Sequence, residues 1–300
     1  MEDKLALITG ASSGIGLELA KELANRGYDV VIASAGDRLS GAAEDIRSRG
    51  HQVIEVNTDL ATREGVDQLW AQVQSLGRPV DIACINAGVG VGGLFSETDL
   101  DTELNMVELN CAGAVQLAKL VVRQMGELNA GKILFTASIA GEMVAPREAV
   151  YAATKAFVLS FAHSLRYELK ETGISVTALQ PGPTDTDFFH RAGMDNTDVG
   201  QKGKSESQPD EVARQGIDAL LAGKDHIYAA SFKTKLEGSF ANVIPGSGKG
   251  RCTRRWPSRT LRNNKAKTDQ DQRPVFAGLD RFNPRPRNQE FVRLCQYVSE

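Results

Sequence analysis

The sequence predicts an α/β protein with one doubly wound parallel sheet of about seven strands and helices on both faces. Short apolar runs of strand length alternate with segments whose apolar residues repeat at helical spacing. The predicted strands are Lys4–Thr9, Asp29–Ser34, Gln52–Asn57, Asp81–Asn86, Lys132–Ser138, Ser175–Gln180 and His226–Ala229. An alternation repeated this often is typical of a parallel sheet, whose crossovers are right-handed.

The helices expected between these strands carry apolar stripes. They are Gly14–Arg26, Glu64–Gln74, Met106–Met125, Val150–Lys170 and a segment from Gln208 to about Ala222. In the first of them, Ile15, Leu19 and Leu23 share one face. The two long segments are apolar on more than one side, and the last one opens with Pro209, which a first helical turn tolerates.

Length and composition indicate one main domain, which we place at residues 1–245. The chain has 300 residues, of which 41% are hydrophobic, enough for a sizeable core. Residues 246–300 hold 13 of the 35 Lys and Arg residues but 5 of the 38 Asp and Glu residues. This basic tail is rich in turn formers without periodicity, so we expect it to be irregular or disordered. A solvated extension is favoured over a surface for nucleic acid or an acidic partner.

Several function classes are not supported. The four cysteines, Cys84, Cys111, Cys252 and Cys295, form no CxxC pair, and the four histidines lack ligand-like spacing. We therefore expect free thiols, no metal site and no disulfide framework. The chain start leaves no room for a signal peptide, and no apolar run approaches the roughly 20 residues of a membrane span. These features predict a cytoplasmic protein without a membrane partner.

A glycine-rich turn, Thr9-Gly-Ala-Ser-Ser-Gly-Ile-Gly16, follows the first predicted strand and opens the first helix. Glycine lets the backbone approach a ligand closely, and the free N–H groups of a helix N-terminus bind phosphate. The spacing is GxxxGxG, whereas the commoner dinucleotide motif is GxGxxG. Phosphate binding is the favoured interpretation, and a turn without a ligand is the alternative.

Other polar or turn-forming residues follow predicted strands at the same edge of the sheet. Asn86-Ala87-Gly88 is a ligand-binding candidate or a plain turn, and Asp59-Leu60 is an adenine contact or a helix N-cap. Pro181-Gly182-Pro183-Thr184 forces an extended turn, after which Thr184 or Thr186 binds a cofactor amide or caps the next turn. Asn110 interrupts a helical pattern, which indicates either function or a solvated polar side chain.

The segment Tyr151-Ala-Ala-Thr-Lys155 carries the strongest chemical signal. Residues four apart share a helix face, so the Lys155 ammonium is expected beside the Tyr151 phenol and is expected to lower the pKa of that phenol. A phenol tuned in this way is a general acid or base. Ser138 ends the fifth predicted strand, at the same edge of the sheet. No GxSxG elbow surrounds Ser138, so a serine nucleophile is not supported.

Together these motifs resemble the short-chain dehydrogenase/reductase family in its single-domain branch, over about residues 4–245. The resemblance implies a Rossmann-type domain and a catalytic tetrad of Asn110, Ser138, Tyr151 and Lys155. The implied cofactor-binding residues are Gly10, Ser12, Ser13, Gly14, Ile15, Gly16, Ser34, Arg38, Asp59, Leu60, Asn86, Ala87, Gly88, Tyr151, Lys155, Pro181, Gly182, Thr184 and Thr186. Ile85 departs from the family's Asn-Asn-Ala-Gly segment and removes one polar side chain next to the sheet.

The resemblance also implies the reaction, an NAD(P)-dependent interconversion of a carbonyl and a secondary alcohol on a small-molecule substrate. Tyr151 would exchange the proton, Ser138 would orient the substrate oxygen, Lys155 would hold the nicotinamide ribose, and Asn110 would support a water that relays protons. A catalytically silent dinucleotide-binding regulator or scaffold is the alternative function.

Cofactor choice depends on the end of the second strand. An acidic residue there binds the ribose 2′-hydroxyl and repels a 2′-phosphate. The position is Ser34, so NADP(H) is favoured and NAD(H) is possible. The arginine that NADP-using relatives often carry next is Ala35 here. Arg38 is a substitute, which Asp37 would oppose.

The substrate side and the assembly are less specified. Asp185–Ser207 corresponds to the family's substrate-covering loop, where Phe188, Phe189 and Met194 line an apolar pocket or anchor the loop. Glu142, Met143 and Val144 resemble substrate-side positions. Relatives assemble through long helices that match Met106–Met125 and Val150–Lys170, so a homo-oligomer is expected, a dimer before a tetramer.

Overall fold

Runs of aliphatic and β-branched residues form seven strands of a single sheet in the computed structural model, which describes residues 4–193 and 207–229. All strand pairs are parallel, as predicted. The strands are β1 (Lys4–Thr9), β2 (Tyr28–Ser34), β3 (Val53–Asn57), β4 (Ile82–Ile85), β5 (Gly131–Thr136), β6 (Ile174–Pro181) and β7 (His226–Ala229). The interior strands are buried on both faces, which explains their continuous apolar runs.

The strand order is β3-β2-β1-β4-β5-β6-β7. The chain moves outward from β1 through β2 to β3, then returns to place β4 on the other side of β1. In register, Ile8 of β1 lies opposite Ile32 of β2 and Cys84 of β4. This reversal of direction opens a crevice at the carboxyl ends of β1 and β4, where doubly wound sheets bind ligands.

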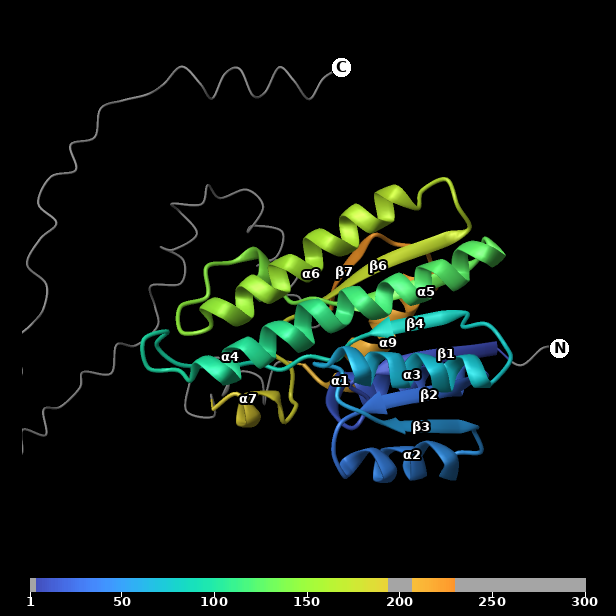
Figure 1. Cartoon of the computed structure of the whole chain (residues 1–300), viewed down its shortest axis with the longest axis horizontal. Helices are drawn as coiled ribbons and strands as arrows, with labels where there is room; N and C mark the ends of the chain where they lie inside the picture. Colours follow the sequence, from blue (N-terminus) through green and yellow to red (C-terminus); the bar gives the residue numbers. More distant parts are fainter. Residues whose placement is uncertain (1–3, 194–206, 230–300) are drawn as a thin grey trace, which may run out of the picture. The chain divides into compact units, whose positions relative to one another are not determined.

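Three helices cover each face of the sheet (Figure 1). On one face lie α3 (Arg63–Ser75), α5 (Ala114–Leu128) and α6 (Ala149–Glu168), whose apolar stripes form one core cluster with the strands. On the other lie α1 (Gly14–Asn25), α2 (Arg38–Ser48) and α9 (Pro209–Leu221). The predicted doubly wound Rossmann-type architecture is therefore confirmed.

Helix α2 was absent from the sequence-based set of helices. Its buried positions, Leu39, Ala42, Ala43 and Ile46, follow helical spacing, but two of them are alanines and charged residues surround them. The apolar stripe is therefore narrow, and burial against the sheet, rather than a strong sequence signal, explains the helix.

The predicted single helix Met106–Met125 is wrong in detail. Three elements take its place, namely α4 (Leu100–Val107), a π-helical segment η1 (Glu108–Gly113) and α5. Gly113 at the end of η1 lets the helix lie against the backbone at Leu60, because a Cβ there would collide with the carbonyl oxygen of Leu60. The fifth strand also ends earlier than predicted, at Thr136, and a short 3-10 helix η2 (Ile139–Glu142) follows Ser138.

Some sequence-based expectations fall outside the described residues. They concern the tail at residues 246–300, which includes Cys252 and Cys295, and residues 194–206 of the loop, which include Met194. Cys84 and Cys111 are both free thiols. In the part of the chain that the structure describes, no helix has the length and apolar character needed to cross a membrane. Over the same residues, no three His, Cys, Asp or Glu side chains gather as metal ligands would.

Candidate active site

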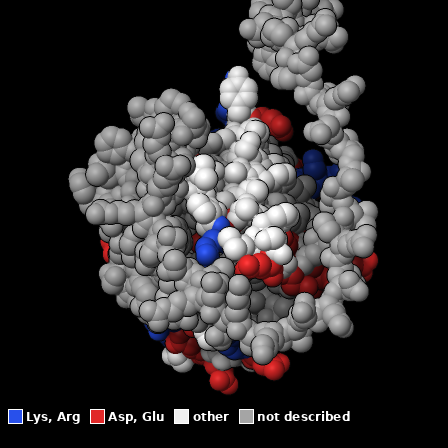
Figure 2. Space-filling model, turned by 90° about the vertical axis from the view of Figure 1, so that its left-hand side faces the viewer, with Lys and Arg blue, Asp and Glu red and all other residues white. Residues whose placement is uncertain are grey.

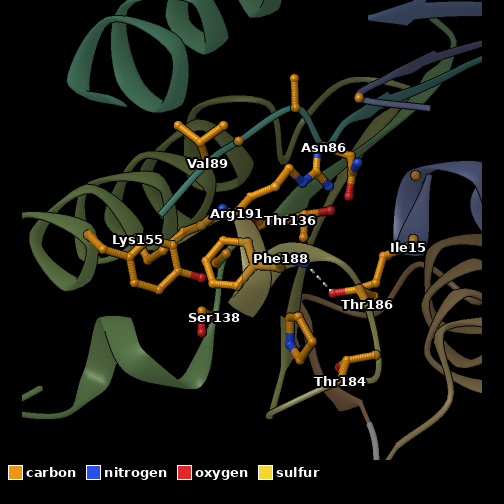
Figure 3. Close-up of a pocket in the computed structure, with 18 of the residues that line it drawn as sticks. Ile15, Asn86, Val89, Thr136, Ser138, Lys155, Thr184, Thr186, Phe188 and Arg191 are labelled. Carbon is orange, nitrogen blue, oxygen red and sulfur yellow. Dashed lines mark hydrogen bonds between the residues drawn. The ribbon is translucent and has the colours of Figure 1, made fainter. Parts of the chain in front are cut away.

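A pocket of about 490 Å³ lies at the carboxyl edge of the sheet, where the turns after β1, β4, β5 and β6 meet. Its size is that of a small-molecule or cofactor site. Figure 2 looks onto this side of the molecule, which lies at the left of Figure 1, and the described residues at its centre are mostly uncharged. In Figure 3, Ser138, Lys155 and Phe188 lie on one side of the pocket, and Ile15 and Thr186 lie on the other.

The glycine-rich turn forms one wall of the pocket. Gly10 has a φ of 69°, and a Cβ there would lie 2.8 Å from the Cα of Ala87, so only glycine fits the turn at this separation from the β4 edge. Thr9 fixes the two turns together, because its Oγ1 accepts hydrogen bonds from the backbone N–H groups of Asn86 and Ala87 at 2.9 and 3.0 Å. At the start of α1, the Ser13 side chain makes no capping hydrogen bond. This helix end lines the pocket, and because the first N–H groups of a helix have no partner within it, the position suits a phosphate.

Ser138, Tyr151 and Lys155 meet on the opposite wall. Ser138 caps η2 by accepting a hydrogen bond from the N–H of Ala140 at 3.1 Å. Its hydroxyl also lies close enough to the phenol of Tyr151, on the first turn of α6, to act on the pKa of that phenol. Lys155, one turn further along α6, donates from Nζ to the carbonyl oxygen of Thr136 at 2.9 Å. Tyr151 and Lys155 lie one turn apart on α6, and Ser138 follows the end of β5. The two elements thus bring these three polar side chains to one wall of the pocket.

Burial sets the ionisation of this group. It raises the pKa of Tyr151 above its ordinary value, whereas the hydrogen bond from Ser138 acts in the opposite direction. Burial also lowers the pKa of Lys155 to about 8. The net pKa shift of Tyr151 is therefore upward, opposite to the lowering that the spacing of Lys155 predicts. The Lys155 ammonium lies 5.8 Å from the centre of the Tyr151 ring and is bonded to Thr136, so burial of the phenol outweighs it.

Asn110 lies in the π-helical segment η1 and is only 2% exposed, so the solvated alternative is wrong. Its Oδ1 accepts from the N–H of Val89, and its Nδ2 donates to the carbonyl of Val89, both at 3.0 Å. Nδ2 also donates to Oγ1 of Thr154 in α6 at 3.0 Å. Asn110 thereby fastens the turn after β4 to the helix that carries Tyr151 and Lys155. π-Helical turns often occur at functional sites.

Nearly all residues predicted for the site line this one pocket. They are Gly10, Ser12, Ser13, Gly14, Ile15, Gly16, Ser34, Asp59, Leu60, Asn86, Ala87, Gly88, Ser138, Tyr151, Lys155, Pro181, Gly182, Thr184 and Thr186. Two predicted residues do not line it. Asn110 lies behind Gly88, where a Cβ would be 3.0 Å from the Asn110 Oδ1. Arg38 lies outside the lining and forms an ion pair with Asp187, 2.6 Å between Nη1 and Oδ2.

Comparison with known proteins places this arrangement in a family. The sequence model of the short chain dehydrogenase family matches residues 4–197. The chain belongs to this family. An uncharacterized oxidoreductase of Staphylococcus saprophyticus is 32% identical over 222 residues, which cover 73% of this chain and 92% of that protein.

Solved structures of short-chain dehydrogenases share the fold. One from Sphingobium yanoikuyae, in complex with NADPH, has a TM-score of 0.69 and 29% identity, and the match covers 75% of this chain and 87% of that one. Another from Burkholderia phymatum, in complex with NAD, has a TM-score of 0.69 and 26% identity, with 76% and 90% covered. Membership in the family supports the predicted class of function, a nicotinamide-dinucleotide-dependent oxidoreductase.

The pocket of this short-chain dehydrogenase fits such a dinucleotide. The Oγ1 of Thr136 is buried at the pocket wall with no hydrogen-bond partner among the described residues. Lys155 has three N–H donors, of which the described residues accept one, at the Thr136 carbonyl. These groups suit the hydroxyls of a ribose, and the glycine turn suits the phosphates.

Some predicted cofactor contacts make local hydrogen bonds as well. The Asp59 carboxylate accepts from the N–H of Ala61 at 3.0 Å, while the N-cap of α3 is Thr62, so the N-cap alternative for Asp59 is wrong. Thr184 donates to the carbonyl of Gly182 at 2.9 Å. Thr186 accepts from the N–H of Phe188 at 3.3 Å, at the start of α7 (Phe188–Arg191), a bond drawn dashed in Figure 3.

The structure adds site residues that the sequence analysis missed. Arg191 of α7 lines the pocket and donates to Oγ of Ser13 at 3.2 Å. Glu148 lines the pocket next to Tyr151. Gly141 lets η2 touch α6, because a Cβ there would lie 2.8 Å from the carbonyl carbon of Lys155 and the nitrogen of Ala156. Of these three residues, only Gly141 could have been noticed in the sequence, because it is a glycine three residues after Ser138.

The substrate-side expectations are partly corrected. Met143 and Val144 line the pocket, as do Phe188 and Phe189. Glu142 is not in the lining. Its carboxylate accepts from Nε2 of Gln180 at 2.7 Å and from the hydroxyl of Tyr228 at 3.1 Å. Glu142 therefore joins η2 to β6 and β7 instead of facing a substrate.

Proposed function

We propose that this short-chain dehydrogenase interconverts a carbonyl compound and a secondary alcohol, with NADP(H) as its preferred cofactor. The observation that carries the proposal is the meeting of Ser138, Tyr151 and Lys155 in one pocket, opposite a glycine turn shaped for phosphates. The buried phenol can donate a proton to a substrate oxygen, and the hydroxyl beside it can orient the same oxygen.

Tyr151 acts as the general acid in the direction of reduction. Because burial raises its pKa, the phenol holds its proton at neutral pH and donates it to a carbonyl oxygen that becomes negatively charged. Ser138 hydrogen-bonds to the same oxygen and fixes its position. The bound nicotinamide supplies or accepts the hydride. Lys155, held by the Thr136 carbonyl, and the Thr136 hydroxyl bind the ribose.

Asn110 contributes by position. Its two amide N–H donors are engaged by Val89 and Thr154, so it fixes the β4 turn relative to α6. A carbonyl oxygen accepts two hydrogen bonds, and Val89 uses one of them. The remaining lone pair is the place where a proton-relaying water would bind.

Preference for NADP(H) rests on the end of β2. Ser34 carries a hydroxyl rather than a carboxylate, and its Oγ lies 3.0 Å from Oγ of Ser12 in the glycine turn. Because this position carries no acidic side chain, a 2′-phosphate is not repelled there. Arg38 at the start of α2 would supply a positive charge for the 2′-phosphate, after its ion pair with Asp187 breaks and the phosphate takes the place of Asp187.

A homodimer through α4, α5 and α6 is the assembly that we propose. Leu104 of α4 is 53% exposed and Phe157 of α6 is 45% exposed, and both helices pack against each other. Exposed large apolar side chains on adjacent helices favour an interface. Sedimentation of the wild type as a dimer and of Leu104→Glu with Phe157→Glu as a monomer would support this assembly, and a monomeric wild type would refute it.

The reaction is tested by following reduced nicotinamide absorbance over a panel of aldehydes, ketones and alcohols with each cofactor. Tyr151→Phe keeps the ring and removes the proton, so we expect a rate loss of about 10² to 10⁴ with cofactor binding retained. Tyr167→Phe is the matched control, because Tyr167 is 71% exposed on the same helix. Cofactor binding without turnover of any panel member would favour the silent regulator.

A further inference from the structure

Glu148 is a buried carboxyl group that the proposed chemistry does not use. It is 7% exposed and lines the pocket, immediately before the first turn of α6. It lies three positions before Tyr151 at the start of α6, and both side chains line the same pocket. Any substrate bound to Tyr151 therefore passes close to this carboxylate.

No structural role accounts for Glu148. It is the N-cap of α6, but its side chain makes no capping hydrogen bond. Among the described residues no hydrogen bond or ion pair to this carboxylate is found. Burial without a partner raises the pKa of Glu148 to about 7. Its oxygens are not among the fully enclosed polar atoms without a partner, so the carboxyl group opens into the pocket, where a group with a raised pKa is a candidate for ligand binding.

The surroundings define what that ligand must carry. Met143, Val144 and Ala145 before Glu148, and Phe188 and Phe189 from the segment after β6, make this side of the pocket apolar. The cationic groups of the pocket, Lys155 and Arg191, hydrogen-bond to Thr136 and Ser13, and among the described residues neither forms an ion pair with Glu148. A neutral donor would hydrogen-bond to the carboxylate but leave its charge uncompensated, whereas an ammonium group compensates it.

We propose that Glu148 binds the substrate and selects carbonyl or alcohol compounds that carry an amine near the reacting carbon on an otherwise apolar body. The same carboxylate disfavours substrates with a carboxylate or phosphate in that place. This inference rests on the proposed oxidoreductase function and adds the substrate class.

The test compares acetophenones that differ in one ring substituent, aminomethyl, methyl or carboxylate, in both meta and para positions. For the wild type we expect kcat/KM to be about tenfold higher for at least one aminomethyl compound than for its methyl partner, with the carboxylate compound poorest. Glu148→Gln should bring the ratio of kcat/KM for the aminomethyl compound to kcat/KM for the methyl compound down to about one, whatever its effect on the methyl compound alone. Glu142→Gln is the matched control and should keep the preference, because Glu142 lies outside the pocket lining.

A binding measurement separates this inference from the reaction itself. Titration calorimetry of the aminomethyl compound is done on the protein saturated with cofactor, for wild type and Glu148→Gln. We expect about tenfold weaker binding to Glu148→Gln and similar binding of the methyl compound to both. Equal affinity of the aminomethyl compound for both proteins would overturn the proposal, whether or not turnover occurs. Turnover absent with binding that depends on Glu148 would refute the reaction and retain the amine site.

Discussion

Arg38 and Asp187 form an ion pair of 2.6 Å between Nη1 and Oδ2, which joins the start of α2 to the segment after β6. The two residues lie 149 positions apart in the sequence. Arg38 belongs to the side of the site proposed for the adenosine phosphate, and Asp187 immediately precedes α7, which carries Phe188 and Arg191. Asp187 therefore competes with a 2′-phosphate for the same guanidinium.

Removing this competitor should strengthen binding of NADP(H). We expect Asp187→Asn to raise the ratio of NADP(H) to NAD(H) affinity about twofold to fivefold, the size of an exposed ion pair. Arg38→Gln should lower the ratio. The measurement is fluorescence titration of both cofactors. Asp185→Asn removes the same charge two residues away without breaking the ion pair, and an equal change in that variant would contradict the competition.

Asn110 should hold the site together through the two segments that it bonds. Asn110→Ala leaves the buried backbone groups of Val89 without their partners, so we expect the free energy of unfolding to fall by about 1–3 kcal/mol. We also expect kcat to fall more than KM for substrate rises. Denaturant unfolding and steady-state kinetics measure both. Asn105→Ala on the exposed side of α4 is the control, and unchanged stability and kcat in Asn110→Ala would exclude the positioning role.

The sequence was sufficient to predict the sheet and most of the pocket, because strand ends in a parallel sheet must meet at one edge. The glycine turn, Asn86 and Ser138 were placed at the pocket for that reason, and helical spacing placed Tyr151 and Lys155 on one side of α6. Arg191 was not predicted, and for Phe188 the sequence left open whether it lines the pocket or anchors the loop, since α7 spans only four residues and tertiary contacts position it. Phe188 packs on the ring of Tyr151 at a centroid distance of 5.2 Å, and Arg191 reaches Ser13.

The direction of the Tyr151 pKa shift also could not be predicted from the sequence. Helical spacing shows that Lys155 shares a face with Tyr151, but it contains no information on how deeply either group is buried. The structure shows that burial dominates both groups and that the ammonium bonds to a backbone carbonyl. Electrostatic predictions from spacing alone therefore need the burial that only the fold supplies.

Gly141 should be necessary for the contact between η2 and α6. In Gly141→Ala the new Cβ would lie 2.8 Å from backbone atoms of Lys155 and Ala156, so η2 must move and carry Ser138 away from Tyr151. We expect kcat to fall about tenfold to a hundredfold, with little change in cofactor affinity. Gly126→Ala is the matched control. Gly126 lies at an exposed position of α5 and its Cβ would meet no atom within 4 Å, so that variant should be slightly more stable and fully active.

The unpartnered carboxyl of Glu148 should be visible in the pH dependence of stability. Its pKa is raised from 4.5 to about 7, so between these values the folded protein binds a proton that the unfolded chain has lost. The contribution of Glu148 to stability is full below about pH 4.5 and declines as the pH rises to about 7, by roughly 3 kcal/mol. Glu148→Gln lacks this decline. Urea unfolding across this range should therefore show the variant gaining stability relative to wild type as the pH rises. The control is Glu171→Gln, because Glu171 is exposed and its loss gives the effect of removing any carboxylate. Parallel curves of unfolding free energy against pH for wild type and Glu148→Gln would show that the Glu148 carboxyl is not held in an unpaired, buried state.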